Sequence, residues 1–214
     1  MLNIQRFVVN MIEENCYVLW DDSREAVVID CGAFYPEEKK AIQDFIDTHE
    51  LRVKRLLQTH AHFDHLFGAD FLYQTYGVRP EMHRNEADTY TNAARQARLF
   101  MHRDLPLTLP PAGPCFDDDS RLTFGHHVLQ VIATPGHTPG GVCFYDSAEA
   151  VLFSGDSLFR HEIGRCDLPG GNEASLVGSL RERILALPDG VTVCPGHGDT
   201  TTVGEERRAN PYLQ

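Results

Sequence analysis

Short apolar runs separated by polar turns dominate the first 60 residues and predict β-strands. Runs of about four to eight residues, rich in β-branched and aromatic side chains and bounded by turn residues, are typical of strands. The predicted strands cover residues 2–9, 15–20, 26–30 and 53–57. The polar sequence Asp21-Asp22-Ser23-Arg24 predicts a hairpin turn between the second strand and the third.

Three segments have the spacing of amphipathic helices, with apolar residues three or four positions apart. Pro36 begins the first helix, and the second follows directly after His65. Ser175 is the predicted N-cap of the third, which ends at Pro188-Asp189-Gly190. The apolar stripes are Ile42, Phe45 and Ile46 in the first helix, Leu66, Ala69, Tyr73 and Tyr76 in the second, and Leu176, Leu180, Ile184 and Leu187 in the third.

Histidine and aspartate side chains follow four of the apolar runs. His60 comes after residues 53–57, His137 after residues 127–133, Asp156 after residues 150–153, and His197 after residues 191–194. If these strands share a sheet, the four side chains emerge at the same edge. His62, Asp64 and His65 stand beside His60 and would join them. Burying so many imidazoles without a metal or polar partners is costly, which disfavours a polar turn that is merely rich in histidine.

Residues 84–114 differ from the pattern around them. Helix-forming residues come first, and four prolines then follow between Leu105 and Pro114. Such a Pro-rich stretch cannot continue a helix or join a central strand. We interpret the segment as an insertion or lid within a single domain that covers residues 1–214. A connector that makes no contact with substrate is the alternative interpretation.

Charge and composition limit the partners of this chain. It has 214 residues, a hydrophobic content of 42% and a formal net charge of −12. Nucleic acids and anionic membranes bind clustered lysine and arginine, so neither is expected as the main partner. The N-terminal residues lack the apolar core of a signal peptide, and a cytoplasmic location is predicted. The six cysteines include no C-x-x-C pair and are expected to be reduced. The sequence does not indicate an oligomeric state.

The candidate ligands form a nitrogen and oxygen donor set without thiolate. They are His60, His62, Asp64, His65, His137, Asp156 and His197. Such a set suits Zn²⁺, with Fe or Mn²⁺ as alternatives, and differs from a structural Cys-rich zinc site. Seven ligands are too many for one tetrahedral ion and suit two divalent ions per chain.

We divide the donors between two neighbouring ions, with Asp156 as the bridge. His60, His62 and His137 would hold one ion, and Asp64, His65 and His197 the other. A bridging carboxylate suits ions about 3.5–4 Å apart, and the pKa of a shared water falls to about 7. A bridging hydroxide is then present at neutral pH, and hydrolysis is the predicted chemistry. Asp64 and Asp156 are the catalytic carboxylates in this scheme.

The ordered motifs resemble those of the metallo-β-lactamase superfamily. They are H-x-H-x-D-H at 60–65, P-G-H at 135–137, S-G-D at 154–156 and P-G-H-G at 195–198, and they span most of the chain. Residues 164–171 and 201–212 are similar to short glyoxalase II-like (hydroxyacylglutathione hydrolase-like) hydrolases. The resemblance implies an α/β fold, a four-layer αββα sandwich with the metals at one edge of two packed sheets.

The resemblance also implies an activity, the hydrolysis of a thioester such as S-D-lactoylglutathione by a metal-bridging hydroxide. The thiol stays open, because the helical domain with which full-length glyoxalase II holds glutathione has no counterpart before Gln214. Arg160, His161 and Arg165 are predicted to meet an anionic group of the substrate, since guanidinium groups suit carboxylates. Salt bridges that brace the loop are the alternative role for these residues.

Other functions fit the same residues. Similar motifs occur in persulfide dioxygenases, whose single iron would be held here by His60, His137 and Asp156. Two histidines and one carboxylate with open positions suit non-haem iron and O₂. A lactonase, a β-lactamase or a phosphodiesterase is also compatible with a two-metal site, although the acidic charge disfavours a nuclease. A metal-binding module without activity is the remaining alternative.

Overall fold

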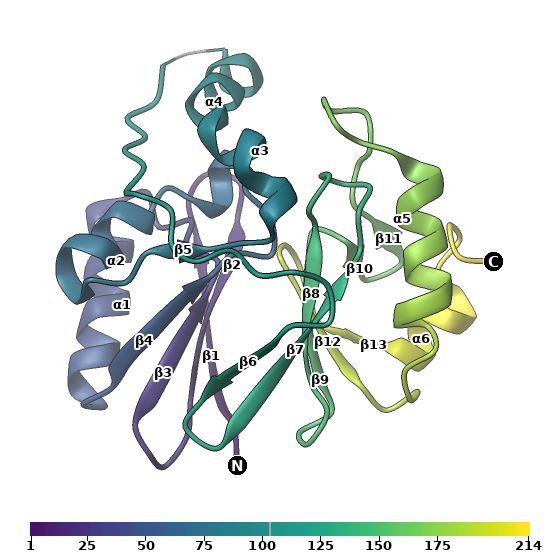
Figure 1. Ribbon diagram of the computed structural model, residues 1–214, viewed down its shortest axis with the longest axis horizontal. Coiled ribbons are helices and arrows are strands. Elements are labelled where there is room, and N and C mark those ends of the chain that lie inside the picture. Colours follow the sequence, from purple (N-terminus) through teal and green to yellow (C-terminus); the bar gives the residue numbers. More distant parts are fainter. Residues whose placement is uncertain (103) are drawn as a thin grey trace.

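Two β-sheets packed face to face form the centre of the computed structural model, which describes residues 1–102 and 104–214 (Figure 1). The first sheet has the strand order β1-β2-β3-β4-β5, and the second has the order β13-β12-β9-β8-β7-β6. The first contains β1 (Asn3–Val9), β2 (Glu14–Trp20), β3 (Glu25–Ile29), β4 (Arg52–Leu57) and β5 (Pro80–Glu81). The second contains β6 (Arg121–Phe124), β7 (His127–Ala133), β8 (Val142–Asp146), β9 (Val151–Gly155), β12 (Thr192–Pro195) and β13 (Thr201–Thr202).

Each sheet contains a parallel pair of strands, and these pairs position much of the site. Strand β3 runs parallel to β4, and β9 runs parallel to β12. The remaining neighbours are antiparallel, except that β5 runs parallel to β4. Because parallel strands end at the same edge, the residues after β9 and β12 are brought side by side. The short hairpin of β10 (Leu158–Phe159) and β11 (Glu162–Ile163) follows β9.

Helices cover the outer faces of both sheets (Figure 1). Helices α1 (Pro36–Thr48) and α2 (Ala69–Tyr76) lie beside the first sheet, and α5 (Glu173–Ser179) and α6 (Val203–Ala209) lie beside the second. Helices α3 (Ala87–Thr91) and α4 (Ala93–Met101) lie together at one end of the molecule, beyond the ends of the strands. This arrangement is the predicted four-layer αββα sandwich.

Alternating side chains along the strands build the layers. In β2, Cys16 and Val18 enter the cluster shared with α1 and α2, whereas Tyr17 and Leu19 enter the cluster between the sheets. In β9, Phe153 lies between the sheets, and its neighbour Leu152 packs toward α5 and α6. Side chains of a strand alternate between its faces, so continuous apolar runs serve two interfaces at once.

The structure tests the predicted starts of two helices. Helix α1 starts at Pro36 as predicted. The predicted N-cap Ser175 is wrong, because α5 begins at Glu173 and Asn172 is its N-cap. Asn172 accepts a hydrogen bond from the Ser175 amide at 3.0 Å. Both residue types cap helices well, and the backbone of Asn172 is held by the Gly136 carbonyl at 2.7 Å, a contact that sequence spacing does not reveal.

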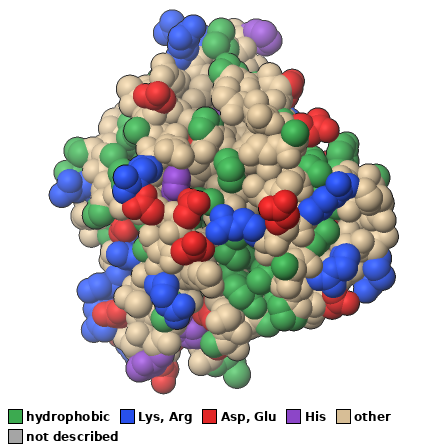
Figure 2. All heavy atoms as spheres, turned by 45° about the vertical axis from the view of Figure 1, so that its right-hand side comes forward, with side chains coloured by type: hydrophobic (Ala, Val, Ile, Leu, Met, Phe, Trp, Pro, Cys, Tyr) green, Lys and Arg blue, Asp and Glu red, His purple; other side chains and the backbone are tan. Residues whose placement is uncertain are grey.

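The segment 84–114 contains a 3₁₀ turn (Arg84–Glu86), α3, α4 and an extended stretch. Arg103 of this segment lies outside the described residues. The extended part is held to the body by backbone bonds such as Gly113 N to Pro80 O at 2.7 Å. On the face shown in Figure 2, basic side chains are scattered among acidic ones. None of the helices in residues 1–102 and 104–214 combines the length and apolar character needed to span a bilayer.

Candidate metal centre

Seven side chains from distant parts of the sequence meet where the strands end. The loop after β4 brings His60 and His62, and the 3₁₀ turn that follows brings Asp64 and His65. The other three come from the turn between β7 and β8, the end of β9 and the end of β12, and they are His137, Asp156 and His197. Five of the seven are buried, and Asp156 and His197 are partly buried. The structure therefore brings together every donor named from the sequence.

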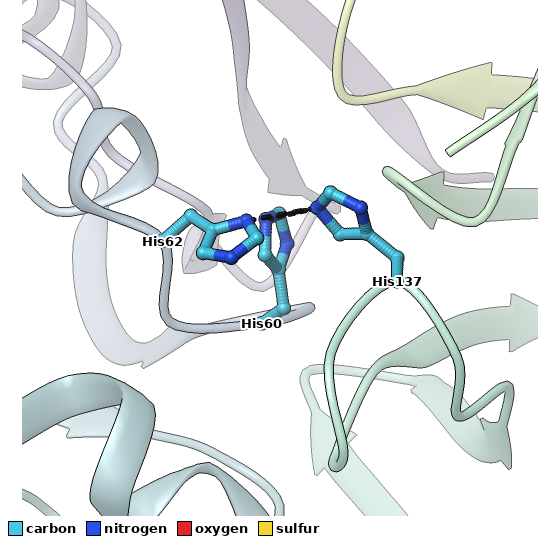
Figure 3. A group of neighbouring side chains, drawn as sticks. All are labelled: His60, His62 and His137. Carbon is cyan, nitrogen blue, oxygen red and sulfur yellow. Dashed lines mark hydrogen bonds between the residues drawn. The ribbon is translucent and has the colours of Figure 1, made fainter. Parts of the chain in front are cut away.

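Three histidines form the first group of candidate ligands. Figure 3 shows the rings of His60, His62 and His137 converging from two facing loops. His137 Nε2 lies 2.9 Å from His62 Nδ1 and 3.3 Å from His60 Nε2. Nitrogens bound to one tetrahedral zinc at about 2.0–2.1 Å are separated by about 3.3 Å. The group therefore has the dimensions of a three-histidine metal site.

The second group contains one carboxylate and two imidazoles. Asp64 Oδ2 lies 3.3 Å from His197 Nε2 and 3.8 Å from His65 Nε2. The ligand atoms of this group all lie within 4.8 Å of one another. These spacings are slightly wider than those of the three histidines and also fit one ion.

Asp156 lies between the two groups and approaches both. Its Oδ1 is 3.3 Å from His65 Nε2, and its Oδ2 is 3.6 Å from both His137 Nε2 and His197 Nε2. The parallel register of β9 and β12, which pairs Gly155 with Pro195, sets this position. A carboxylate whose oxygens reach two groups of donors is placed as a bridge between two ions.

The outward ring nitrogens of four histidines have partners that fix the ring orientation. His137 Nδ1 donates to the Arg165 carbonyl at 2.7 Å, and His197 Nδ1 donates to the Ile12 carbonyl at 3.1 Å. Because a carbonyl only accepts, the proton stays on Nδ1 and leaves Nε2 as a lone-pair donor toward the centre. The other two contacts join His60 Nδ1 to Thr59 Oγ1 at 3.1 Å and His65 Nδ1 to Asp30 Oδ2 at 3.0 Å.

Asp30 is a supporting residue that the sequence prediction missed. It follows β3 in the left-handed region, with φ of 48°, and accepts from Thr59 N at 2.8 Å and Thr59 Oγ1 at 2.7 Å. Asp30, His60 and His65 could also surround an ion by distance alone. We assign Asp30 to support instead, because its two oxygens already accept three hydrogen bonds. Its place after a strand, like that of Asp156, was the available signal.

Burial keeps two of the imidazoles in the form that binds metals. It lowers the pKa of His62 to about 4, with the neighbouring His137 adding to the effect. Burial, reinforced by His65, also holds the pKa of His60 well below its usual value. Both rings are therefore neutral at pH 7, and neutral imidazole is the ligand form.

The opposite shifts occur at the junction of the two groups. Burial alone would lower the pKa of His65, but Asp156, Asp30 and Asp64 outweigh it and raise that pKa well above its usual value. Burial would raise the pKa of Asp156, but His197 and His65 hold it well below its usual value. A carboxylate that stays ionised when buried among imidazoles favours the binding of a cation.

Unpartnered buried atoms provide a test of whether the residues fit metal ions. Among the described residues, His65 Nε2 and Asp156 Oδ1 are buried and lie 3.3 Å apart, but neither makes a hydrogen bond of good geometry to any group. A Cβ added at Gly196 would lie 2.3 Å from Asp156 Oδ1, so the backbone there leaves no room for a side chain. Buried polar atoms without partners are rare, and metal ions would satisfy both. The donor set therefore fits divalent metals.

A cavity of about 1200 Å³ opens beside these residues. Five of the seven donors line it, and they are His62, Asp64, His137, Asp156 and His197. Of the three residues predicted to contact substrate, Arg160 and Arg165 line the cavity. Arg165 also pairs with Asp167 at 2.7 Å. The third, His161, is not among the lining residues.

His161 instead contacts helix α6, and its predicted contact with substrate stays a prediction. Its Nε2 lies 3.0 Å from Glu205 Oε1, and its backbone amide donates to Glu206 at 2.9 Å. The residue occupies the left-handed region, with φ of 63°. For His161, the bracing role fits the observed contacts.

Comparison with known proteins identifies the family. The profile of the metallo-beta-lactamase superfamily matches residues 12–197. The chain is 35% identical to hydroxyacylglutathione hydrolase GloC of Haemophilus influenzae, over 99% of this chain and 98% of that protein. It is 34% identical to the probable metallo-hydrolase YqgX of Bacillus subtilis, over 98% and 96%.

Solved structures agree with this placement. BLEG-1 B3 metallo-beta-lactamase superposes with a TM-score of 0.90 at 36% identity, covering 99% of this chain and 100% of that one. TTHA1623 in a di-iron-bound form gives 0.86 at 37%, covering 98% and 100%. ETHE1 from Myxococcus xanthus gives 0.80 at 25%, covering 98% and 83%. The chain belongs to the metallo-β-lactamase superfamily and is a metallo-hydrolase of that superfamily.

Proposed function

We propose that this protein hydrolyses a small anionic thioester, of the S-D-lactoylglutathione type, at a two-metal centre. The position of Asp156 carries the proposal, because its oxygens approach both groups of donors at 3.3–3.6 Å. One ion is assigned to His60, His62 and His137, and the other to Asp64, His65 and His197. Zn²⁺ is the proposed metal, with Fe or Mn²⁺ as alternatives that the same donors accept.

Divalent ions at this centre would lower the pKa of a bound water and polarise the thioester carbonyl. The chain's own residues do the rest. Asp64 and Asp156 line the cavity, so their carboxylates can accept hydrogen bonds from the attacking water and orient it toward the substrate. The ring of His137 cannot turn, because its Nδ1 is fixed to the Arg165 carbonyl.

The leaving group distinguishes a thioester from an amide. A thiol has a pKa of about 8.5, so a thiolate departs near neutral pH without first receiving a proton. The carboxylates at the centre are kept ionised, as the lowered pKa values of Asp64 and Asp156 indicate, and are poor proton donors. Burial raises both of these pKa values, but neighbouring histidines, His65 first for Asp64 and His197 first for Asp156, outweigh it. The site therefore suits a substrate whose leaving group needs no acid.

The similarity to hydroxyacylglutathione hydrolase GloC supports the choice of substrate class, since the two chains align over nearly their whole lengths. Arg160 and Arg165 line the cavity and provide positive charge for an anionic thiol portion. Phe63 and Phe100, with ring centroids 5.7 Å apart, provide an apolar part of the cavity lining.

The experiment is a substrate panel assayed with protein of known metal content. Acyl-thioesters, lactones, phosphodiesters and persulfides are compared, and oxygen uptake is recorded for the persulfides. The proposal expects two metals per chain, thioester turnover as the highest kcat/KM, and no oxygen consumption. A preference for lactones or phosphodiesters would keep the two-metal centre and replace the substrate class.

A mononuclear iron persulfide dioxygenase is the second candidate. The similarity to ETHE1 from Myxococcus xanthus favours it, and His60, His137 and Asp156 are within reach of one another. However, His62 Nδ1 lies even closer to His137 Nε2, at 2.9 Å, and would take a position that a two-histidine iron site leaves open for O₂. One iron per chain with oxygen uptake on a persulfide would establish this candidate.

A further inference from the structure

Helix α4 divides its residues between the protein interior and the cavity. Ala93 and Ala97 are buried, and Met101, four residues further on, packs against the same core cluster. Other positions of the helix, together with the N-cap, supply five cavity-lining residues. They are Asn92, Arg95, Gln96, Leu99 and Phe100. One side of the helix thus holds the segment in place, and the other side is available to a ligand.

The cavity-facing side combines bare apolar surface with an unengaged cation. Leu99 is 62% exposed and Phe100 is 44% exposed, and among the described residues these two are the exposed large hydrophobics that line the cavity. Nearby arginines have carboxylate partners, Arg98 at 2.5 Å from Asp104 and Arg165 at 2.7 Å from Asp167. No such ion pair is seen for Arg95 within residues 1–102 and 104–214.

We propose that this side of α4 is a substrate-binding wall that determines specificity. Arg95 binds a carboxylate of the substrate, and Leu99 with Phe100 packs against an apolar portion of the same molecule. Residues four apart on a helix are separated by about 6 Å along its axis. The preferred thioester therefore carries its carboxylate about that distance from an apolar group. This inference rests on the proposed thioesterase function, which it refines.

Matched pairs of substrates test this wall. Arg95→Gln should raise KM roughly tenfold or more for a thioester with a carboxylate and leave KM unchanged for the neutral amide analogue of that carboxylate. Leu99→Ser should raise KM for a bulky apolar group more than for a small one. Arg98→Gln is the control, because Arg98 points to Asp104 and does not line the cavity.

Equal KM values for the Arg95→Gln variant and the wild type on the carboxylate substrate would overturn the inference that α4 binds the substrate. An equal rise on both members of the pair would do the same, because it would show a general disturbance. If wild-type protein hydrolyses no thioester, the proposed function fails instead, so the two failures are distinguishable.

Glu86 lies at the start of the segment that leads to α3 and α4. Its side chain is fully buried, and its two oxygens accept backbone hydrogen bonds from two separate loops. Oε2 accepts from Ala61 N at 2.8 Å, between His60 and His62. Oε1 accepts from Gly140 N at 2.7 Å, three residues after His137. A Cβ at Gly140 would lie 2.9 Å from Glu86 Cγ, so the loop leaves no space there.

We infer that Glu86 is the positioning residue of the three-histidine group. One carboxylate ties together the two loops that carry these ligands and anchors the cavity-lining helices to them. Outer contacts of this kind commonly change metal affinity by about 10–100-fold when removed. In Glu86→Gln the amide nitrogen would face one of the two N–H donors, so one bond is replaced by a donor–donor contact.

Metal titration tests this role without any substrate. Glu86→Gln should weaken binding of one of two Co²⁺ ions at least tenfold, read by chelator competition and by visible absorption. Glu206→Gln is the control, a buried glutamate that accepts from His161 N and Asn210 Nδ2 and holds α6 rather than the histidine loops. Loss of thermal stability in both variants with unchanged Co²⁺ affinity in Glu86→Gln would reduce Glu86 to a structural residue and overturn the inference.

Discussion

Replacing Asp30 by asparagine should weaken metal binding through His65, a residue 35 positions away in sequence. In the native protein, Asp30 Oδ2 accepts from His65 Nδ1 at 3.0 Å and from Thr59 Oγ1 at 2.7 Å. Asparagine has the same shape, and its oxygen can still accept from Thr59 N. Its NH₂ group would then face the His65 N–H. To avoid this donor–donor contact, His65 must give up its Nδ1 proton and keep the one on Nε2, the atom that faces Asp156.

The size of the effect follows from these contacts. A protonated Nε2 cannot bind a metal, so loading must reverse the tautomer or break the contact. Changes to partners of this kind cost about 10–100-fold in metal affinity, which corresponds to about 1.4–2.7 kcal/mol. The metal-free protein should also lose about 2 kcal/mol in free energy of unfolding, because a buried hydrogen bond to a charged group is lost.

Chelator competition with Zn²⁺ and thermal unfolding of the metal-free protein measure the two effects separately. Asp146→Asn is the matched control. Buried Asp146 lies 2.8 Å from Nδ1 of buried His127, and this pair is not part of the metal centre. The substitution should lower stability as Asp30→Asn does and leave metal affinity unchanged. Equal Zn²⁺ affinity in wild type and Asp30→Asn would refute the tautomer reasoning.

Three further predictions follow from the site. Gly196→Ala should abolish metal binding at the centre, measured by metal analysis, because its Cβ would lie 2.3 Å from Asp156 Oδ1; full metal content would contradict this. Asp156→Ala should eliminate turnover and lower metal content, whereas His49→Ala, at an exposed position against the Phe45 ring, should keep kcat near that of the wild type. In the metal-free protein, the lowered pKa of His62, about 4 against 6.5, means that the unfolded chain binds more protons between these values. Stability should therefore fall as pH drops from 6.5 to 4, by up to roughly 3 kcal/mol from this residue, and His62→Gln should flatten the urea-unfolding profile in that window.

The fold and the convergence of the seven candidate donors could be predicted because both depend on strand ends. Apolar runs that stop at a histidine or aspartate, as before His137 and Asp156, place these side chains at one edge of a packed sheet pair. The αββα sandwich is confirmed, whereas the ligand role of each donor stays a prediction.

Contacts that arise only after folding could not be read from the sequence. Asp30 meets His65 because β3 and β4 pair in parallel, and Glu86 meets partners 25 and 54 residues away. His161 and Arg160 are neighbours, yet only Arg160 lines the cavity, whereas His161 contacts Glu205 and Glu206 of α6. Spacing within one segment contains no information about these pairings.

Anomalous scattering from crystals of the metal-loaded protein tests the central claim most directly. The proposal predicts two peaks per chain, one within the group of His60, His62 and His137 and one within the group of Asp64, His65 and His197, with Asp156 between them. A single peak, or two peaks at any other place, would contradict the two-metal centre on which the proposed hydrolysis depends.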